Sequence, residues 1–90
     1  MYRVIITPQA KEDLQKLQKS EPKAFAKAGR FIEELREHPT TGTGHPEPLK
    51  GNRSGQWSRE ITKKHRMVYE IFETEVHVDV VSAYGHYGDK

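Results

Sequence analysis

The sequence predicts an α+β fold in which two helices pack on one face of a mainly antiparallel sheet. Three observations support this prediction. A short β-rich segment comes first, two stretches with helical periodicity follow it, and three β-branched and aromatic runs come last. Two consecutive helices followed by consecutive strands favour a layered α+β arrangement over an alternating one. The predicted order is therefore β-α-α-β-β-β.

The composition fits one small globular domain. The 90 residues are 33% hydrophobic and 31% charged, which suits a soluble protein with a lean core. We expect residues 1–90 to form this single domain. Cysteine is absent, so a disulfide framework, a thiolate metal site and a cysteine nucleophile are excluded.

No segment of the sequence predicts membrane insertion or export. The opening apolar run is too short for a secretory signal, and no later run approaches the roughly 20 apolar residues that a membrane span needs. We therefore expect a cytoplasmic protein. The net charge of +2 is only a mild bias towards polyanions.

The first strand and the first helix meet at Thr7-Pro8. Residues 2–6 alternate in β-type fashion, and Thr can cap a helix whose first position is Pro. A helix is predicted from Pro8 to about Lys19. Its apolar positions are Ala10, Leu14 and Leu17.

The second helix is predicted from Glu21 to about Glu37, after the capping signature Ser20-Glu21-Pro22. Its apolar stripe consists of Phe25, Ala28, Ile32 and Leu35, joined by Ala24 and Phe31. Core positions expected to be largely buried are Phe25, Ile32, Leu35, Val68 and Val80.

Residues 38–48, with three prolines and two glycines, form a loop. The strands predicted after it are Gln56 to Ile61, His65 to Phe72 and Val76 to Tyr84. Charged turns separate these runs, which favours an antiparallel meander. A short extra strand near Leu49 is left open.

Glu47 is the first candidate for chemistry. It lies in Pro46-Glu47-Pro48, where the proline rings limit the backbone and favour extended geometry. A carboxylate held stiffly on a loop is a candidate general base, although solvated loop glutamates are more common.

Basic residues surround the predicted first hairpin and could bind an RNA backbone. They are Lys50, Arg59, Lys63, Lys64 and Arg66. Lysines in a hairpin turn are usually just solvated, and strand cations also protect sheet edges from aggregation. Arg66 differs because it shares one side of its strand with Val68 and Phe72, so its charge needs a partner.

His86 and Tyr87 follow the last predicted strand, after a glycine that lets the chain bend. Histidine is the usual proton donor near neutral pH, although a lone histidine is more often structural. The other histidines show no spacing typical of zinc, so we expect no metal and no cofactor. Trp57 and Tyr69 could stack on bases, but ordinary core packing explains both.

Four segments together resemble the YoeB/Txe group of the RelE/ParE toxin superfamily. In order they are GHPEPLK (44–50), SGQWSR (54–59), HRMVY (65–69) and His86-Tyr87. The match spans nearly the whole chain, and the order and spacing are more specific than any one motif.

The resemblance implies a RelE-like fold and the toxin half of a bacterial type II toxin–antitoxin pair. It further implies a ribosome-dependent endoribonuclease that cleaves messenger RNA in the A site without a metal. By this match Glu47 corresponds to the general base, Arg66 to the transition-state cation and His86 to the general acid. Lys50 and Tyr87 correspond to supporting residues. Arg59, Lys63 and Lys64 are expected to bind RNA or the ribosome because of their charge and their place around the first hairpin.

The resemblance also implies partners. These are a YefM-like antitoxin, the ribosome and messenger RNA, with operator DNA bound only through the antitoxin complex. A homodimer stays open, since a lean core gains from partner-assisted stability.

Two features depart from the family pattern. Glu60 stands where a second arginine would follow Trp-Ser-Arg, and residues 88–90 extend the chain past Tyr87. Glu60 places an anion near the expected phosphate surface unless it points away. The alternative function is a non-catalytic RNA- or ribosome-binding module.

Overall fold

A computed structural model of the chain describes residues 1–51 and 55–85. Its described elements are β1 (Arg3–Ile6), α1 (Pro8–Ser20), α2 (Pro22–Glu37), β2 (Glu47–Pro48), β3 (Gln56–Glu60), β4 (Arg66–Phe72) and β5 (His77–Ser82). The predicted α+β order is confirmed, and β2 supplies the short extra strand next to Leu49.

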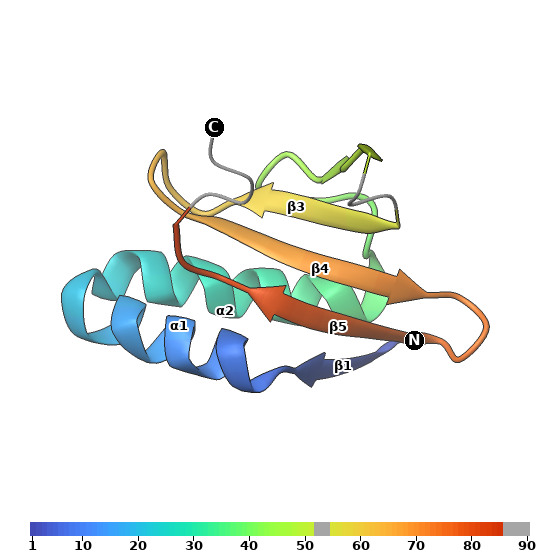
Figure 1. Cartoon of the computed structure of the whole chain (residues 1–90), viewed down its shortest axis with the longest axis horizontal. Helices are drawn as coiled ribbons and strands as arrows, with labels where there is room; N and C mark the ends of the chain where they lie inside the picture. The colour runs from blue at the N-terminus through green and yellow to red at the C-terminus, as the bar shows by residue number, and fades with distance from the viewer. Residues whose placement is uncertain (52–54, 86–90) are drawn as a thin grey trace.

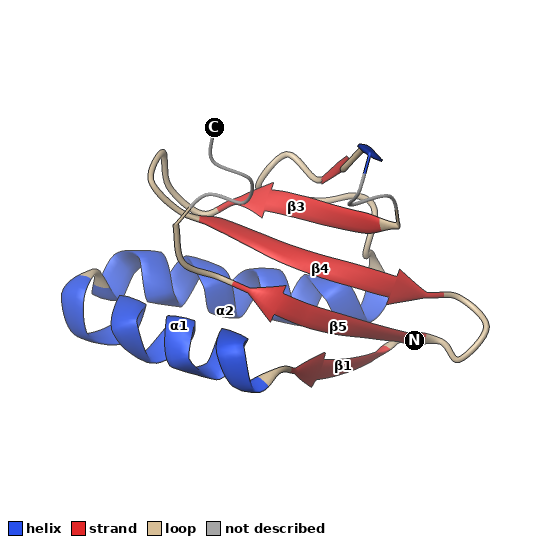
Figure 2. Cartoon of the chain, viewed as in Figure 1, coloured by secondary structure: helices blue, strands red, loops and turns tan. Residues whose placement is uncertain are grey.

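The strands form one mixed sheet in the order β1-β5-β4-β3-β2 (Figure 2). Three of its four pairings are antiparallel, as the meander predicts. β1 instead runs parallel to β5, with Arg3 opposite His77 and Ile6 opposite Val80. The first strand of the sheet therefore completes its hydrogen bonding only against the last.

Both helices cover the same face of the sheet, as predicted (Figure 1). Side chains of α1 and α2 share one buried cluster with alternate residues of β4 and β5. Its members are Ala10, Leu17, Ala24, Ala28, Phe31, Leu35, Ile61, Met67, Tyr69, Val78, Val80 and Ala83. In residues 1–51 and 55–85, no helix lies on the opposite face of the sheet.

The predicted cap at the start of α1 is confirmed. The Thr7 hydroxyl accepts a hydrogen bond from the Ala10 amide at 3.2 Å, and Pro8 occupies the first turn. The same hydroxyl lies 2.9 Å from the Val80 carbonyl oxygen, to which it can donate. One side chain thus ends β1, starts α1 and fixes both against β5.

The predicted cap at the start of α2 is wrong. The helix begins at Pro22, and the Glu21 side chain makes no capping hydrogen bond. The Ser20 hydroxyl donates back to the Lys16 carbonyl at 2.8 Å. Glu21 is engaged elsewhere, because its carboxylate binds the ring of His65 at 2.8 Å. The Glu21 side chain therefore makes a contact with a residue distant in the sequence and does not cap its own helix.

The predicted core is right in part. Leu35, Val68 and Val80 are buried, whereas Phe25 and Ile32 are only half-buried. The buried stripe of α2 runs through Ala24, Ala28, Phe31 and Leu35. The two bulky residues therefore flank the helix–sheet contact, since the small alanines let α2 approach its neighbours closely.

The strand ends also differ from the prediction. β5 is shorter than the predicted Val76 to Tyr84. Val76 belongs to the turn, with a left-handed φ of 55°, and a register shift at Val68/Tyr69 interrupts the β4–β5 pairing. No helix among residues 1–51 and 55–85 is long and apolar enough to cross a membrane.

Candidate functional site

Glu47 and Arg66, two of the predicted site residues, lie close together in the structure. Arg66 Nη1 is 3.8 Å from Glu47 Oε2. The Glu47 side chain is 52% exposed and that of Arg66 is 22% exposed, so a ligand can reach the carboxylate while the cation stays partly shielded. Partial burial strengthens the field of a cation, because water screens it less.

The sheet register explains why these two residues meet. Glu47 pairs with Ser58, and Ser58 pairs with Val68 on β4. Residues directly opposite each other on paired strands share a face, and alternate residues of β4 place Arg66 on the face of Val68. Arg66 Nη1 also lies 3.5 Å from the buried Ser58 hydroxyl. The pair therefore lies on the face away from the helices.

Glu60 does not point away from this site. Its Oε1 lies 3.9 Å from Arg66 Nη2, and the two residues are direct partners in the β3–β4 register. Arg66 thus has carboxylates at both of its terminal nitrogens. A substrate phosphate that approached this guanidinium would meet a cation already partly neutralised.

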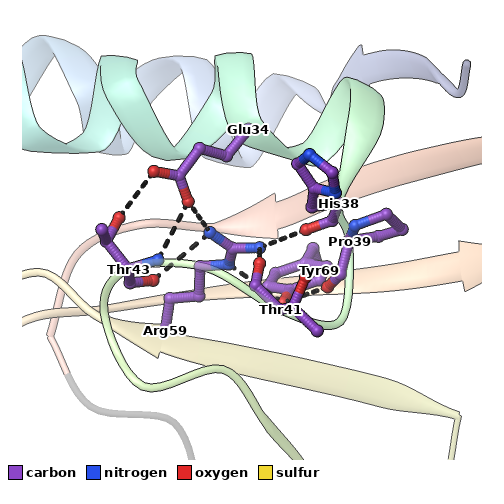
Figure 3. Close-up of polar contacts among 7 residues, drawn as sticks. All are labelled: Glu34, His38, Pro39, Thr41, Thr43, Arg59 and Tyr69. Carbon is purple, nitrogen blue, oxygen red and sulfur yellow. Dashed lines mark hydrogen bonds and ion pairs between the residues drawn. The ribbon is translucent and has the colours of Figure 1, made fainter.

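Arg59 occupies the other face and is fully buried (Figure 3). Its Nε donates to the Tyr69 hydroxyl at 3.2 Å, and its Nη1 donates to Glu34 at 2.6 Å and to the Thr43 carbonyl at 3.3 Å. Its Nη2 donates to the His38 and Thr41 carbonyls at 2.6 and 2.8 Å. These five bonds match the five N–H donors of a guanidinium.

The prediction that Arg59 binds RNA or the ribosome is therefore wrong. Its charge is enclosed and its donors are used within the fold. The sequence held a signal for this, because Arg59 lies between Trp57 and Ile61 in strand alternation and so shares their inward face. A buried arginine must be paired, and here it organises the loop that follows α2.

The Arg59 cluster also contains Glu34, Thr43 and Tyr69. In it the Glu34 carboxyl is ionised and the Tyr69 hydroxyl is protonated. Burial disfavours the charge of Glu34, but hydrogen bonds from Thr43 and Arg59 outweigh burial and lower the pKa of this carboxyl. Burial raises the pKa of Tyr69, although Arg59 opposes that effect. The Tyr69 hydroxyl therefore stays protonated and donates to the Pro39 carbonyl at 2.7 Å.

The same loop carries Glu47 to its place. The Glu60 amide donates to the Gly44 carbonyl at 2.7 Å, which fixes the loop against β3 three residues before Glu47. Gly44 has a φ of 81°, and a β-carbon there would overlap the Phe31 ring. Glycine is therefore required both by the backbone and by the close approach to α2.

The remaining predicted site residues are less constrained. Lys50, Lys63 and Lys64 are exposed, and Lys64 Nζ lies 3.5 Å from Glu21 Oε2. His86 and Tyr87 lie outside the described residues. The described chain leads up to them through Gly85, whose carbonyl accepts the Arg66 amide at 2.9 Å.

The predicted packing roles of two aromatic residues are confirmed. Tyr69 is fully buried, and Trp57 is partly buried against the helix-side cluster. Within residues 1–51 and 55–85, no group of three or more His, Asp or Glu side chains could hold a metal ion.

Comparisons with known proteins agree with this architecture. Solved structures of similar fold include a YoeB/ParE toxin from Agrobacterium tumefaciens, with a TM-score of 0.86 and 32% identity over 94% of this chain and 99% of that one. A YoeB dimer and a YoeB-YefM complex from Staphylococcus aureus each give a TM-score of 0.80. Their identities are 32% and 31%, over 96% and 97% of this chain and 98% and 99% of theirs. The fold is that of the RelE/YoeB class of small toxins.

The sequence comparisons define the family. Residues 6–87 match the model of the YoeB-like toxin of bacterial type II toxin-antitoxin systems. The toxin YoeB of Streptomyces coelicolor is 38% identical over 85 residues, which cover 94% of this chain and 99% of that protein. The chain belongs to the YoeB toxin family.

Arg59→Met should destabilise the fold strongly. The methionine keeps the aliphatic length but removes every donor, so Glu34 and three loop carbonyls lose their buried partner. We expect a loss of about 3 kcal/mol or more in the free energy of unfolding, measured by urea denaturation. Lys63→Met, an exposed control, should change it by less than about 0.5 kcal/mol. Equal stability of the two variants would contradict the structural role of Arg59.

Stability should depend on pH through Glu34. Because the folded-state pKa of this carboxyl is lowered, its contribution is complete above the unfolded pKa of about 4.3 and is lost as pH falls through the folded value. Wild type should exceed Glu34→Gln in unfolding free energy at pH 7, and the gap should narrow below about pH 4. Chemical denaturation from pH 7 to pH 3 measures this gap. A gap that stays constant would exclude the linkage.

Proposed function

We propose that this protein is a ribosome-dependent endoribonuclease that cleaves messenger RNA in the ribosomal A site. The observation that most supports this proposal is the 3.8 Å approach of Arg66 to Glu47 on the sheet face opposite the helices. A cation beside an accessible carboxylate suits a reaction in which a proton leaves while negative charge grows on a phosphate. Family membership supports the toxin role. The ribosome as the setting is part of the proposal.

The proposed chemistry uses the RNA as its own nucleophile. Glu47 takes the proton of a ribose 2′-hydroxyl, and the 2′-oxygen attacks the adjacent phosphorus. Arg66 stabilises the charge that develops on the phosphoryl oxygens. The bond from phosphorus to the 5′-oxygen then breaks, and His86 donates the proton that this oxygen requires. The products are a 2′,3′-cyclic phosphate and a 5′-hydroxyl, with Lys50 and Tyr87 as supporting groups.

The proposal includes a YefM-like antitoxin as partner. The S. aureus relative has been solved with YefM and also as a dimer, and it aligns with nearly all of this chain. An antitoxin segment that folds on binding could cover the Glu47–Arg66 face and block access to RNA. Homodimerisation is proposed on the same likeness. Operator DNA would be bound only by the complex with the antitoxin.

A non-catalytic RNA- or ribosome-binding module is the alternative. The exposed Lys63 and Lys64 on the β3–β4 turn favour it, since such cations hold phosphates without moving protons. This module would protect or stall messenger RNA on the ribosome and would leave it uncut.

Removal of either proton-transfer group should abolish most cleavage and spare binding. We expect Glu47→Ala and His86→Ala to lower the single-turnover rate on saturating ribosomes by on the order of 10² to 10⁴. Ribosome affinity should change little, because neither group is proposed to hold the phosphate backbone. Sequencing the 5′ ends of messenger RNA on purified ribosomes measures the cut.

Lysine variants provide the contrast for this test. Lys63→Gln and Lys64→Gln should weaken association and reduce its salt dependence while the chemical step stays nearly intact. If the lysine variants had the larger defect in the chemical step, or if His86→Ala cut as fast as wild type, the roles would be wrongly assigned. Protection of messenger RNA without a cut by wild type would favour the binding module.

Glu60→Gln should improve substrate binding. Removal of the carboxylate 3.9 Å from Arg66 takes away one of the two anions that partly neutralise the guanidinium, so a phosphate is attracted more strongly. For a partly exposed ion pair we expect a gain on the order of two- to five-fold in apparent affinity for programmed ribosomes. Glu75→Gln, in the turn at the far end of β4, makes the same charge change as a control. Equal effects of the two variants would mean that only net charge matters.

A further inference from the structure

His65 is a buried histidine that the proposed reaction does not use. It directly precedes β4, and only 4% of its surface is exposed. Its Nε2 lies 2.8 Å from Glu21 Oε2, and its Nδ1 accepts the Gly85 amide at 2.9 Å. One ring therefore joins the start of α2 to the last described residue of the chain, through what we name the His65 bridge: Glu21, His65 and Gly85.

The partners define the protonation of the ring. A backbone amide can only donate, so Nδ1 must be the nitrogen without a proton. The proton then lies on Nε2 and faces the Glu21 carboxylate, which gives the neutral Nε2–H tautomer. The hydrogen bond from His65 lowers the pKa of Glu21 against the effect of burial, and the Lys64 charge lowers it further. At neutral pH the Glu21 carboxylate at one end of the bridge is therefore anionic, and the Gly85 amide at the other end donates to the ring.

Gly85 is held from two sides. Its amide donates to the His65 ring, and its carbonyl accepts the Arg66 amide at 2.9 Å. The ring of Tyr84, the preceding residue, lies 4.5 Å from that of His65. Gly85 has a φ of 77°, a left-handed conformation that favours glycine and turns the chain as it leaves the sheet. These contacts fix the exit of the chain beside the backbone of Arg66.

The base of the bridge is itself rigid. The His65 carbonyl accepts the amides of Ile61 and Thr62 at 3.0 and 3.1 Å, and the His65 amide lies 3.2 Å from the Thr62 hydroxyl oxygen. These bonds fix the backbone from which the ring projects, and the Glu21 and Gly85 contacts then hold the ring itself. A ring held in this way can act as a fixed support for another segment.

We propose that the His65 bridge positions the general acid, by fixing the direction in which the chain leaves the sheet one residue before His86. His65 and Glu21 are positioning residues that do not touch the RNA. Arg66, adjacent in sequence to His65, is tied to the same exit point through its amide, which donates to the Gly85 carbonyl. This inference rests on the proposed function for its catalytic consequence.

Two amide substitutions separate the halves of the bridge. An asparagine side chain places its oxygen near the position of Nδ1, so His65→Asn keeps an acceptor for the Gly85 amide and loses Glu21. A glutamine reaches the position of Nε2, so His65→Gln keeps a donor to Glu21 and leaves the Gly85 amide without an acceptor. His38→Gln, at an exposed histidine, is the matched control.

Three readouts apply to the folded proteins. Nitrogen NMR of the wild-type ring should show the Nε2–H tautomer, and the Gly85 amide should exchange slowly with solvent. His65→Gln should lose that protection and cleave at least ten-fold more slowly in single turnover, with ribosome affinity unchanged. His65→Asn should retain most of the protection and stay within a few-fold of wild type. His38→Gln should match wild type.

The outcomes separate this inference from the proposed function. A freely exchanging Gly85 amide in wild type, or a His65→Gln protein that cuts as fast as wild type, would overturn the bridge. A wild-type protein with a protected amide that never cleaves messenger RNA would overturn the nuclease and support the bridge as a structural hold on the chain. Should His65→Gln not fold, Glu21→Ala replaces it, with an expected partial loss of both protection and rate.

Discussion

The buried guanidinium of Arg59 is the constraint on which the rest of this structure depends. A charge enclosed in a lean core is tolerated only when each donor has an acceptor, and these acceptors come from α2, from the loop after it and from β4. The loop has no regular structure of its own and takes its shape from these bonds. Since that loop leads to Glu47, a residue on the helix-covered face determines the geometry on the opposite face.

The two faces of the sheet thus differ in how they hold an arginine. One is packed by the helices and contains the satisfied cation Arg59, while the other presents Arg66 between Glu47 and Glu60. Arg59 and Arg66 lie seven residues apart in the sequence. They point to opposite faces of the sheet because successive residues of a strand alternate between the two faces. The family resemblance assigns a role to Arg66, and the structure explains why Arg59 could not share it.

Local signals predicted most of the fold. The Thr7-Pro8 cap, the helical periodicity of both helices and the strand runs depend on neighbouring residues, and each appears in the structure. The parallel β1–β5 pair was not predictable in this way, because pairing between distant strands leaves no local pattern. The helix cap predicted at Ser20-Glu21-Pro22 was wrong for the same reason, since the Glu21 side chain binds His65, which is far along the chain. At the site, the resemblance brought Glu47 and Arg66 together, but the burial of Arg59 required attention to strand parity.

The parallel pairing of β1 with β5 has a consequence for synthesis. β1 is synthesised first, but it can pair only after β5 has been synthesised. Thr7 and Asp13 also lack hydrogen-bond partners until then, because those partners are the backbone groups of Val80 and Ala83. Contacts so distant in sequence form only after the intervening chain has been ordered. A nascent chain that stops before β5 therefore lacks the strand that joins β1 to the rest of the sheet. The sheet therefore cannot be completed until β5 has been translated.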